Sequence, residues 1–179
     1  MPSLVLHPDD PGWHPSQTAS LWAALREQGL LASDCQPDVS VPCLAGERFF
    51  QFIMFLGCSP QVALTAEDAA AGAPPCTVCF NEFDTVRLVA AQRRQPARCP
   101  DCGREALIDE AVADQMYTCA NCNKRVPMHR LDWRQAAGFG RFFIEVSGIY
   151  PHEAVPTDRL LEKLRDFSHC DWKYFFVTG

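Results

Sequence analysis

Two closely spaced cysteine pairs, Cys99-x-x-Cys102 and Cys119-x-x-Cys122, constrain the fold of this chain more than any other feature. Each pair is short enough to sit in a tight turn that directs both sulfurs to one point. The sixteen residues between the pairs allow a short hairpin to bring the second pair opposite the first. Four thiolates in this arrangement form the tetrahedral cage that zinc prefers. The spacing therefore predicts a Zn²⁺ site with these four cysteines as its ligands.

The residues around the pairs agree with this prediction. Gly103 and Asn123 directly follow the second cysteine of each pair, where the chain must turn back and a left-handed residue is favoured. Residues 98–126, with CPDCG and CANCNKRV as the two knuckles, resemble the zinc-ribbon superfamily. The resemblance implies a bound metal and a local fold. It implies no particular activity, because zinc ribbons serve many functions.

A third pair, Cys76-x-x-Cys79, leaves the ligand assignment open. It could combine with the first ribbon pair, it could begin a second metal site completed by His129 or Cys58, or it could be a redox dithiol. Spacing alone does not fix which pairs share a metal. We prefer the two ribbon pairs because both are followed by polar turn residues, whereas Cys79 is followed by Phe80.

The remaining cysteines stand alone, and a lone cysteine is expected to be a small buried hydrophobe. The amino terminus has neither a positively charged start nor a long apolar run, so we expect no secretory signal and a cytoplasmic location. In a reducing compartment, ten cysteines favour metal ligation or thiol chemistry over disulfides. The longest apolar run, residues 49–56, is far shorter than the ~20 residues that cross a bilayer, so no membrane partner is expected. The lone cysteines are Cys35, Cys43, Cys58 and Cys170.

The charge of the chain is unevenly distributed. The formal net charge is −6, of which residues 76–138 contribute +1 and the rest −7. An acidic body repels phosphate, so the net charge disfavours nucleic acid as a partner and leaves protein as the expected one. A nucleic-acid-binding ribbon would have to use a few basic residues, namely Arg93, Arg94, Arg98, Lys124 and Arg125.

The segments on either side of the cysteines predict two similar halves. Both halves contain Arg-Phe-Phe followed by Gly-x-x-Pro, which suggests a repeated strand. We therefore predict an α+β fold, a ferredoxin-like βαβ-βαβ sandwich with the ribbon inserted between its second and third strands. The expected elements are strands at 3–7, 46–57, 139–151 and 172–178, with helices that begin near 16–18 and 157–158.

The corresponding domains are a first βαβ half at 1–72, an inserted zinc-ribbon module at 73–138 and a second half at 139–179. No nucleotide-binding glycine loop, serine elbow or His-Glu-x-x-His helix is present in the sequence. The leading hypothesis is thus a zinc-binding, non-catalytic protein whose structural ribbon supports protein recognition. The alternatives are a thiol-redox or other enzyme using Cys76 and Cys79, and a nucleic-acid-binding ribbon. The aromatic strand WKYFFV also suggests a homodimer.

Overall fold

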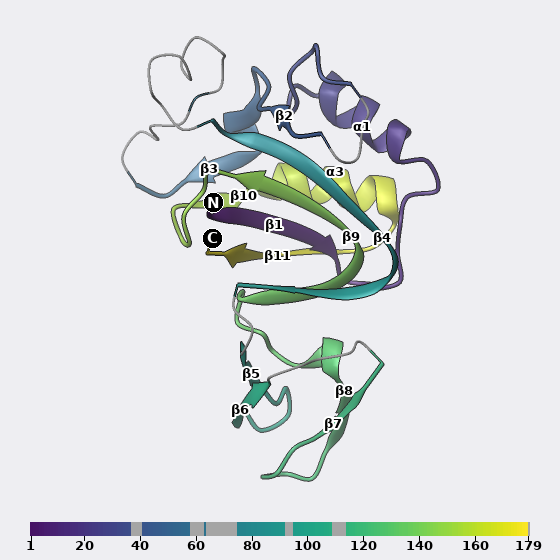
Figure 1. Cartoon of the computed structure of the whole chain (residues 1–179), viewed down its shortest axis with the longest axis vertical. Helices are drawn as coiled ribbons and strands as arrows, with labels where there is room; N and C mark the ends of the chain where they lie inside the picture. Colours follow the sequence, from purple (N-terminus) through teal and green to yellow (C-terminus); the bar gives the residue numbers. More distant parts are fainter. Residues whose placement is uncertain (37–40, 58–62, 64–74, 92–94, 109–113, 179) are drawn as a thin grey trace.

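The computed structural model describes residues 1–36, 41–57, 63, 75–91, 95–108 and 114–178. Its largest element is a five-stranded antiparallel sheet in the order β11-β1-β9-β4-β2 (Figure 1). Strand β1 pairs with β11 on one side and with β9 on the other, so the two ends of the described chain lie side by side. The strands of this sheet are β1 (Ser3–Pro8), β2 (Cys43–Leu44), β4 (Thr77–Ala90), β9 (Ala137–Ser147) and β11 (Trp172–Val177).

A bulge in β4 bends the sheet into a half-barrel (Figure 1). Glu82 pairs with Phe142 and Arg87 with Gly140, so four residues of β4 stand opposite Arg141 alone. The Arg141 Nε donates to the carbonyl of one of these four residues at 3.3 Å. Extra residues in one strand of a pair increase the local bend and twist. The long β4–β9 pair therefore curls away from the plane of β1 and β11.

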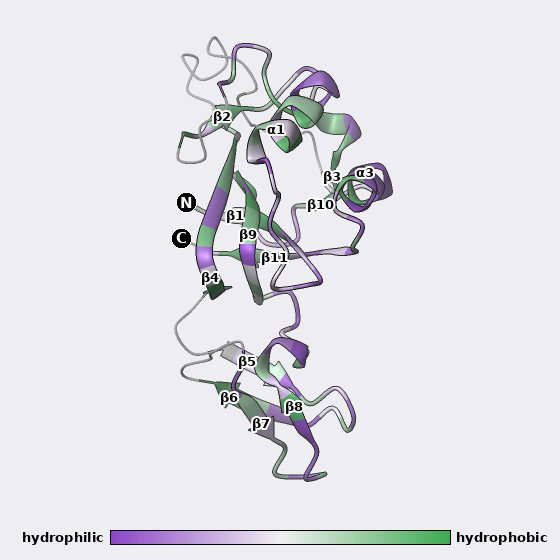
Figure 2. Cartoon of the chain, turned by 90° about the vertical axis from the view of Figure 1, so that its right-hand side faces the viewer, coloured by the Kyte–Doolittle hydropathy of each residue, from purple (hydrophilic) through white to green (hydrophobic). Residues whose placement is uncertain are grey.

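Two helices, α1 (Thr18–Glu27) and α3 (Asp158–Ser168), cover one face of the sheet (Figure 2). Thr157 caps α3, as its side chain accepts a hydrogen bond from the Leu160 amide. No helix in the described part of the chain is long and apolar enough to span a membrane. The buried residues between helices and sheet include Leu4, Leu6, Leu21, Trp22, Leu25, Val78, Phe80, Phe142, Ile144, Val146, Leu160 and Leu164.

The strand expected at 46–57 does not join this sheet. It forms a 3₁₀ turn, η1 (Phe49–Gln51), and then the short β3 (Ile53–Phe55), which pairs only with β10 (Ala154–Pro156). Phe49, Phe52 and Ile53 are all buried, and their spacing of three and one fits a turn rather than the alternation of a strand. The prediction of one continuous strand over this apolar run is therefore wrong, because its buried residues have the spacing of a turn.

The ferredoxin-like βαβ-βαβ prediction is wrong. The protein is mostly β, and its sheet is a curled half-barrel. Strand β4, one of the two strands that pair with β9, lies within the segment predicted as the inserted module. The two Arg-Phe-Phe segments also differ, because one lies in η1 and the other in β9. The domain boundaries at 1–72, 73–138 and 139–179 stay a prediction.

Between β4 and β9 the chain forms two small hairpins, which we call the ribbon. They are β5 (Gln95–Arg98) with β6 (Glu105–Ile108), and β7 (Met116–Thr118) with β8 (Arg125–Pro127). A 3₁₀ turn, η2 (Met128–Arg130), follows β8 and leads back to β9. An apolar cluster joins the ribbon to the curled end of the sheet, with buried members Ala97, Ile108, Met128, Leu131, Trp133, Ala137 and Phe139.

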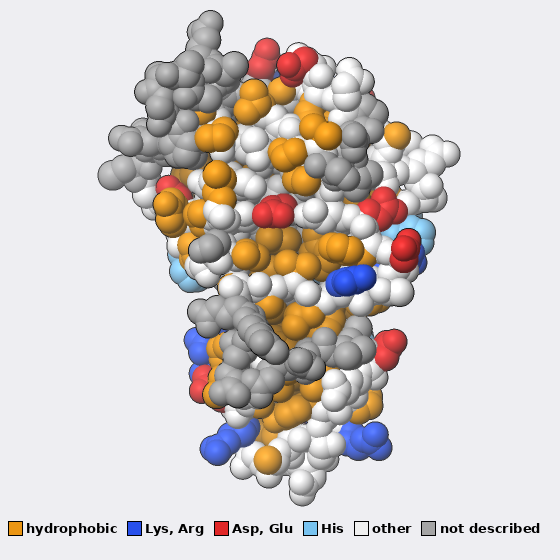
Figure 3. Space-filling model, in the orientation of Figure 1, with side chains coloured by type: hydrophobic (Ala, Val, Ile, Leu, Met, Phe, Trp, Pro, Cys, Tyr) orange, Lys and Arg blue, Asp and Glu red, His pale blue; other side chains and the backbone are white. Residues whose placement is uncertain are grey.

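The sheet face away from the helices carries its own apolar cluster. Val5, Phe143 and Phe175 are buried there, and Phe83, Val89 and Val177 are partly buried against them. Figure 3 shows this side of the molecule, with apolar side chains gathered across its middle above the ribbon. The sheet is thus apolar on both faces, and its curl contributes to covering the second one.

Candidate metal centre

The two knuckles of the ribbon have the same backbone geometry. The Cys99 carbonyl accepts a hydrogen bond from the Gly103 amide at 2.9 Å, and the Cys99 amide donates to the Arg104 carbonyl at 3.0 Å. The corresponding bonds of Cys119, with Asn123 and Lys124, are both 2.9 Å long. Gly103 and Asn123 have φ values of +70° and +56°, which confirms the expected left-handed turn residues. Each turn therefore directs its two sulfurs to the same side.

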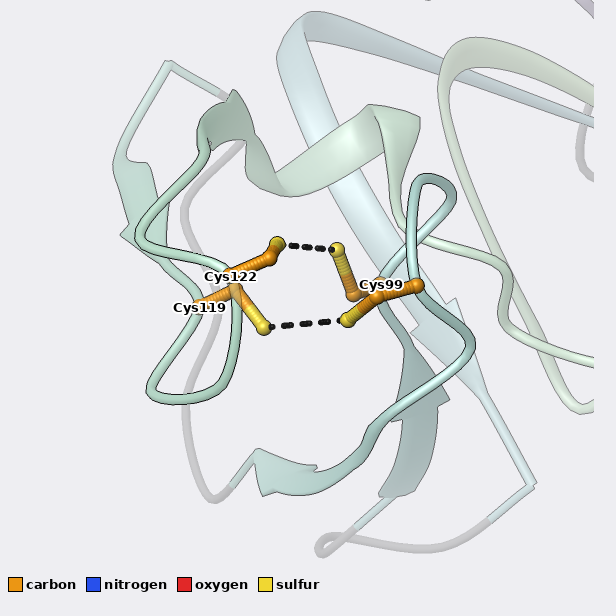
Figure 4. Close-up of side chains that lie close together, drawn as sticks. Cys99, Cys119 and Cys122 are labelled. Carbon is orange, nitrogen blue, oxygen red and sulfur yellow. Dashed lines mark hydrogen bonds between the residues drawn. The ribbon is translucent and has the colours of Figure 1, made fainter.

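The four sulfurs meet at distances that fit one metal ion. The Cys99 and Cys122 Sγ atoms are 3.7 Å apart, and the Cys102 and Cys119 Sγ atoms 3.6 Å (Figure 4). All four lie within 4.8 Å of one another. A Zn–S bond of about 2.3 Å gives a tetrahedron with sulfur–sulfur edges of about 3.8 Å, whereas a disulfide bond is only about 2.05 Å long. The geometry thus fits a tetrathiolate metal site.

At two of the four cysteines, backbone amides favour the thiolate form that a metal needs. The amides of Cys122 and Asn121 lower the pKa of the Cys119 thiol to about 6. The Arg104 amide likewise lowers the pKa of the Cys102 thiol. Such bonds stabilise the charged sulfur more than the neutral one. Of the four side chains, those of Cys99 and Cys119 are buried, that of Cys122 is half-buried and that of Cys102 is exposed.

The charges around the knuckles are largely balanced. Arg98 bonds Glu105 at 2.8 Å, and Lys124 lies 3.4 Å from Asp101. Two of the basic residues proposed for phosphate binding are therefore already ion-paired. Arg125 is exposed, and the other two candidates, Arg93 and Arg94, lie outside the described residues.

The third cysteine pair is not brought together. Cys76 is fully buried in the helix-covered core, just before β4, and Cys79 points to the opposite face beside Glu145. Alternate residues of a strand face opposite sides, so residues three apart cannot share a ligand. Burial raises the pKa of Cys76 to about 12, and burial together with the Glu145 charge raises that of Cys79. Both shifts disfavour a reactive thiolate.

Two cysteines that the sequence left unassigned do meet. Cys35 and Cys43 are joined by a disulfide, with Cα atoms 5.7 Å apart. No motif marks this pair, and the expected reducing compartment argued against it. Cys170 is half-buried and its sulfur contacts the Ser168 hydroxyl at 3.3 Å. Cys58 lies outside the described residues.

Within the described residues, the ribbon cysteines are the only group of three or more metal-ligating side chains close enough to share an ion. His129 lies in η2 and is not part of that group. The site is therefore defined by its own geometry. Scans against protein-family models, curated proteins and solved structures found no match to this chain.

Proposed function

We propose that this chain is a zinc-binding, non-catalytic protein whose ribbon is held in shape by one structural zinc ion. The observation that carries this proposal is the meeting of four cysteine sulfurs at the edge lengths of a tetrahedron. Four thiolates fill the coordination sphere of zinc and leave no position for a substrate or a water, as in structural rather than catalytic sites. A tetrathiolate site would also accept iron, so the metal must be identified directly.

We further propose that the ribbon binds a protein. Two large apolar side chains are exposed on its hairpins, Leu107 at 65% and Met116 at 42%. Two of its basic residues, Arg98 and Lys124, are paired with acids, as described above. Exposed apolar side chains on a surface with balanced charge suit a protein partner better than a phosphate backbone.

Elemental analysis of the purified protein tests the metal site. We expect one zinc per chain in the wild type and in Cys76→Ser, and loss of that zinc in Cys102→Ser. Cys76→Ser is the matched control, because it makes the same chemical change in a C-x-x-C pair outside the cluster. Iron in place of zinc, two metals per chain, or full occupancy in Cys102→Ser would contradict the proposal.

Partner capture with two matched methionine variants tests the recognition surface. Met116→Glu changes the ribbon, and Met54→Glu changes a methionine on β3 that is 50% exposed. We expect Met116→Glu to reduce retention of a protein that Met54→Glu and the wild type retain equally. Steeply salt-dependent binding of duplex DNA or single-stranded RNA by the wild type would replace this proposal with the nucleic-acid alternative.

A further inference from the structure

A cavity of about 450 Å³ lies where the ribbon meets the sheet. Its volume falls within the range of small-molecule sites, roughly 300–1,000 Å³. One wall is formed by the ends of β1, β9 and β11, and the other by residues 129–135, which connect the ribbon to β9. Polar and apolar surface contribute about equally to the lining, and its large apolar and aromatic side chains are Leu131, Trp133, Phe139, Leu161, Trp172 and Tyr174.

The ribbon holds the second wall in place. The Arg98 amide donates to the Asp132 carbonyl at 2.8 Å, and the Asp132 amide donates back at 2.9 Å. Leu131 and Trp133 pack in the cluster that also contains Ala97 of β5. The residues that close the cavity are thus fixed by the same hairpin that supplies two of the four cysteines.

Most neutral polar groups at the cavity already have partners. Trp133 donates its indole N–H to the Met128 carbonyl at 3.0 Å, and Trp172 donates to the Ser168 hydroxyl at 2.8 Å. His7 is buried, and its Nδ1 lies 2.9 Å from the Pro8 carbonyl. A carbonyl only accepts, so Nδ1 carries the proton and Nε2 of the neutral ring does not. The indole groups therefore have no free donor to offer a ligand.

Two of the groups with remaining donor capacity are cationic. Arg130 is exposed and makes no ion pair with any residue that the structure describes, and Arg134 has only a 3.5 Å contact with Glu105. Lys173 at the rim is paired with Asp9 at 2.5 Å. The lining contains three Arg or Lys side chains against two Asp, in a chain whose net charge is −6. The cavity is therefore a locally positive place on an acidic protein.

The backbone positions these groups at some conformational cost. Arg134 and Gln135 are consecutive left-handed residues, with φ values of 51° and 58°. The Asp132 carboxylate accepts from the Arg134 amide at 2.9 Å, and the Gln135 carbonyl accepts from the Phe176 amide at 3.0 Å. On the opposite wall Gly138 lies so near His7 that an added Cβ would come within 2.6 Å of the imidazole Nε2. The backbone conformation of both walls is thus closely constrained.

We infer that this cavity binds a small organic anion with an apolar ring, whose carboxylate or phosphate contacts Arg130 and Arg134 while the ring lies among the aromatic side chains. A charged group suits the open donors of the two arginines, and an apolar ring suits the aromatic side chains that share the lining with them. This inference is independent of the proposed protein partner. Only its coupling to the metal rests on the ribbon site.

A pair of fluorescent probes tests it on the metal-loaded full chain. Anilinonaphthalene sulfonate carries an anion on an aromatic body, and N-phenyl-1-naphthylamine is its uncharged counterpart. We expect saturable 1:1 binding of the sulfonate, weakened about tenfold by Arg130→Gln, since the variant removes a charge-assisted hydrogen bond. The uncharged probe should be insensitive to that variant. Lys163→Gln, the same charge change at an exposed position on α3, should leave both probes unaffected.

A filling variant separates the cavity from other apolar patches. Leu161→Trp enlarges a half-buried side chain of the lining and should weaken both probes while the melting temperature is kept. Sulfonate binding that neither Arg130→Gln nor Leu161→Trp changes would overturn the inference, because the probe would then lie elsewhere. Displacement by benzoate or by phenyl phosphate identifies the preferred head group, and displacement by neither would also overturn it.

A separate experiment tests whether the cavity depends on the metal site. In Cys102→Ser the wall at 129–135 should lose its support, so Arg130→Gln should no longer alter sulfonate affinity. If Arg130→Gln still weakens sulfonate binding in Cys102→Ser, the cavity is not coupled to the metal site, but the cavity inference itself stands. Elemental analysis checks separately that Cys102→Ser has lost its zinc.

Discussion

The chain contains the C-x-x-C pattern three times, and it uses the pattern in two different ways. In the ribbon, a left-handed residue turns the chain after each pair and both sulfurs face one point. At Cys76 and Cys79 the same spacing lies along an extended chain, and the two side chains face opposite sides of the sheet. The comparison shows that the backbone conformation between and after the cysteines, rather than their spacing, determines whether a pair can chelate.

The largest expected difference between the two kinds of pair is the effect of removing the metal. Structural zinc contributes about 10–16 kcal/mol to the folding of small zinc peptides, so chelation should unfold β5 to β8. Amide hydrogen exchange should then become fast in the ribbon and stay slow in β1, β9 and β11. Cys76→Ser should respond to the chelator as the wild type does. Fast exchange throughout the sheet would show that the metal supports the whole fold.

Alkaline pH should lower the stability of the fold through Cys76, a member of the non-chelating cysteine pair. The folded-state pKa of Cys76 is raised to about 12 from an ordinary value of 9.0, because burial disfavours the thiolate. The native state therefore holds a proton that the unfolded state releases, and stability falls as pH rises above 9. The slope is about 1.4 kcal/mol per pH unit, or about 4 kcal/mol by pH 12.

Urea unfolding at pH 8 and pH 10, followed by tryptophan fluorescence, measures this loss. Cys76→Ala lacks the titrating group and should show a shallower decline than the wild type over the same interval. Equal slopes for the two proteins would mean that Cys76 ionises freely in the folded state, and the contrast with the ribbon would fail.

The Cys35–Cys43 disulfide is a third way in which this chain uses paired cysteines, and its contribution to stability can be measured. Cys35 and Cys43 enclose a short loop, and closing a loop of this length stabilises a protein by about 2.5 kcal/mol in the chain-entropy account. Addition of a reductant should lower the urea midpoint of the wild type accordingly. Cys43→Ala should start at the lower midpoint and be insensitive to reductant. If the wild type does not respond either, the two thiols are not joined in solution.

The smallest effect concerns the turn that distinguishes a chelating pair. Asn123 is left-handed, and alanine in that conformation costs about 1 kcal/mol more than asparagine or glycine. Competition with a chromophoric chelator should show about fivefold weaker zinc binding for Asn123→Ala and undiminished binding for Asn123→Gly. Equal affinities for all three proteins would remove the turn from the explanation.

The metal cluster could be predicted from sequence because its determinants are local. Each knuckle is specified within five residues by one C-x-x-C spacing and one turn residue, Gly103 in the first and Asn123 in the second. The side-chain cap of α3 at Thr157 and the strands near 3–7, 139–151 and 172–178 were also readable from short patterns, whereas α1 begins after Gln17 with no side-chain cap.

The sheet could not be predicted in the same way. The burial of residues 77–90 alternates only as far as the bulge, and Cys79 among them belongs to a C-x-x-C pattern that is typical of metal sites as well. The run at 46–57 was rich in aromatic residues, yet a 3₁₀ turn buries Phe49 and Phe52 together. The disulfide and the cavity depend on residues that are distant in sequence or unmarked by motif, so tertiary structure alone reveals them.

The position of β1 has a consequence for how the protein is made. Its neighbours are β9 and β11, so Ser3 pairs with Ser147 and Val177, whereas every ribbon cysteine lies within 23 residues of the other three. Contacts of long sequence separation form late, because a long loop must close first. During synthesis the ribbon can therefore close while β1, every residue of which is buried in the finished protein, still lacks both neighbours. We therefore expect β1 to stay unpaired longest during synthesis. Misfolding on the ribosome is expected to begin at this exposed strand.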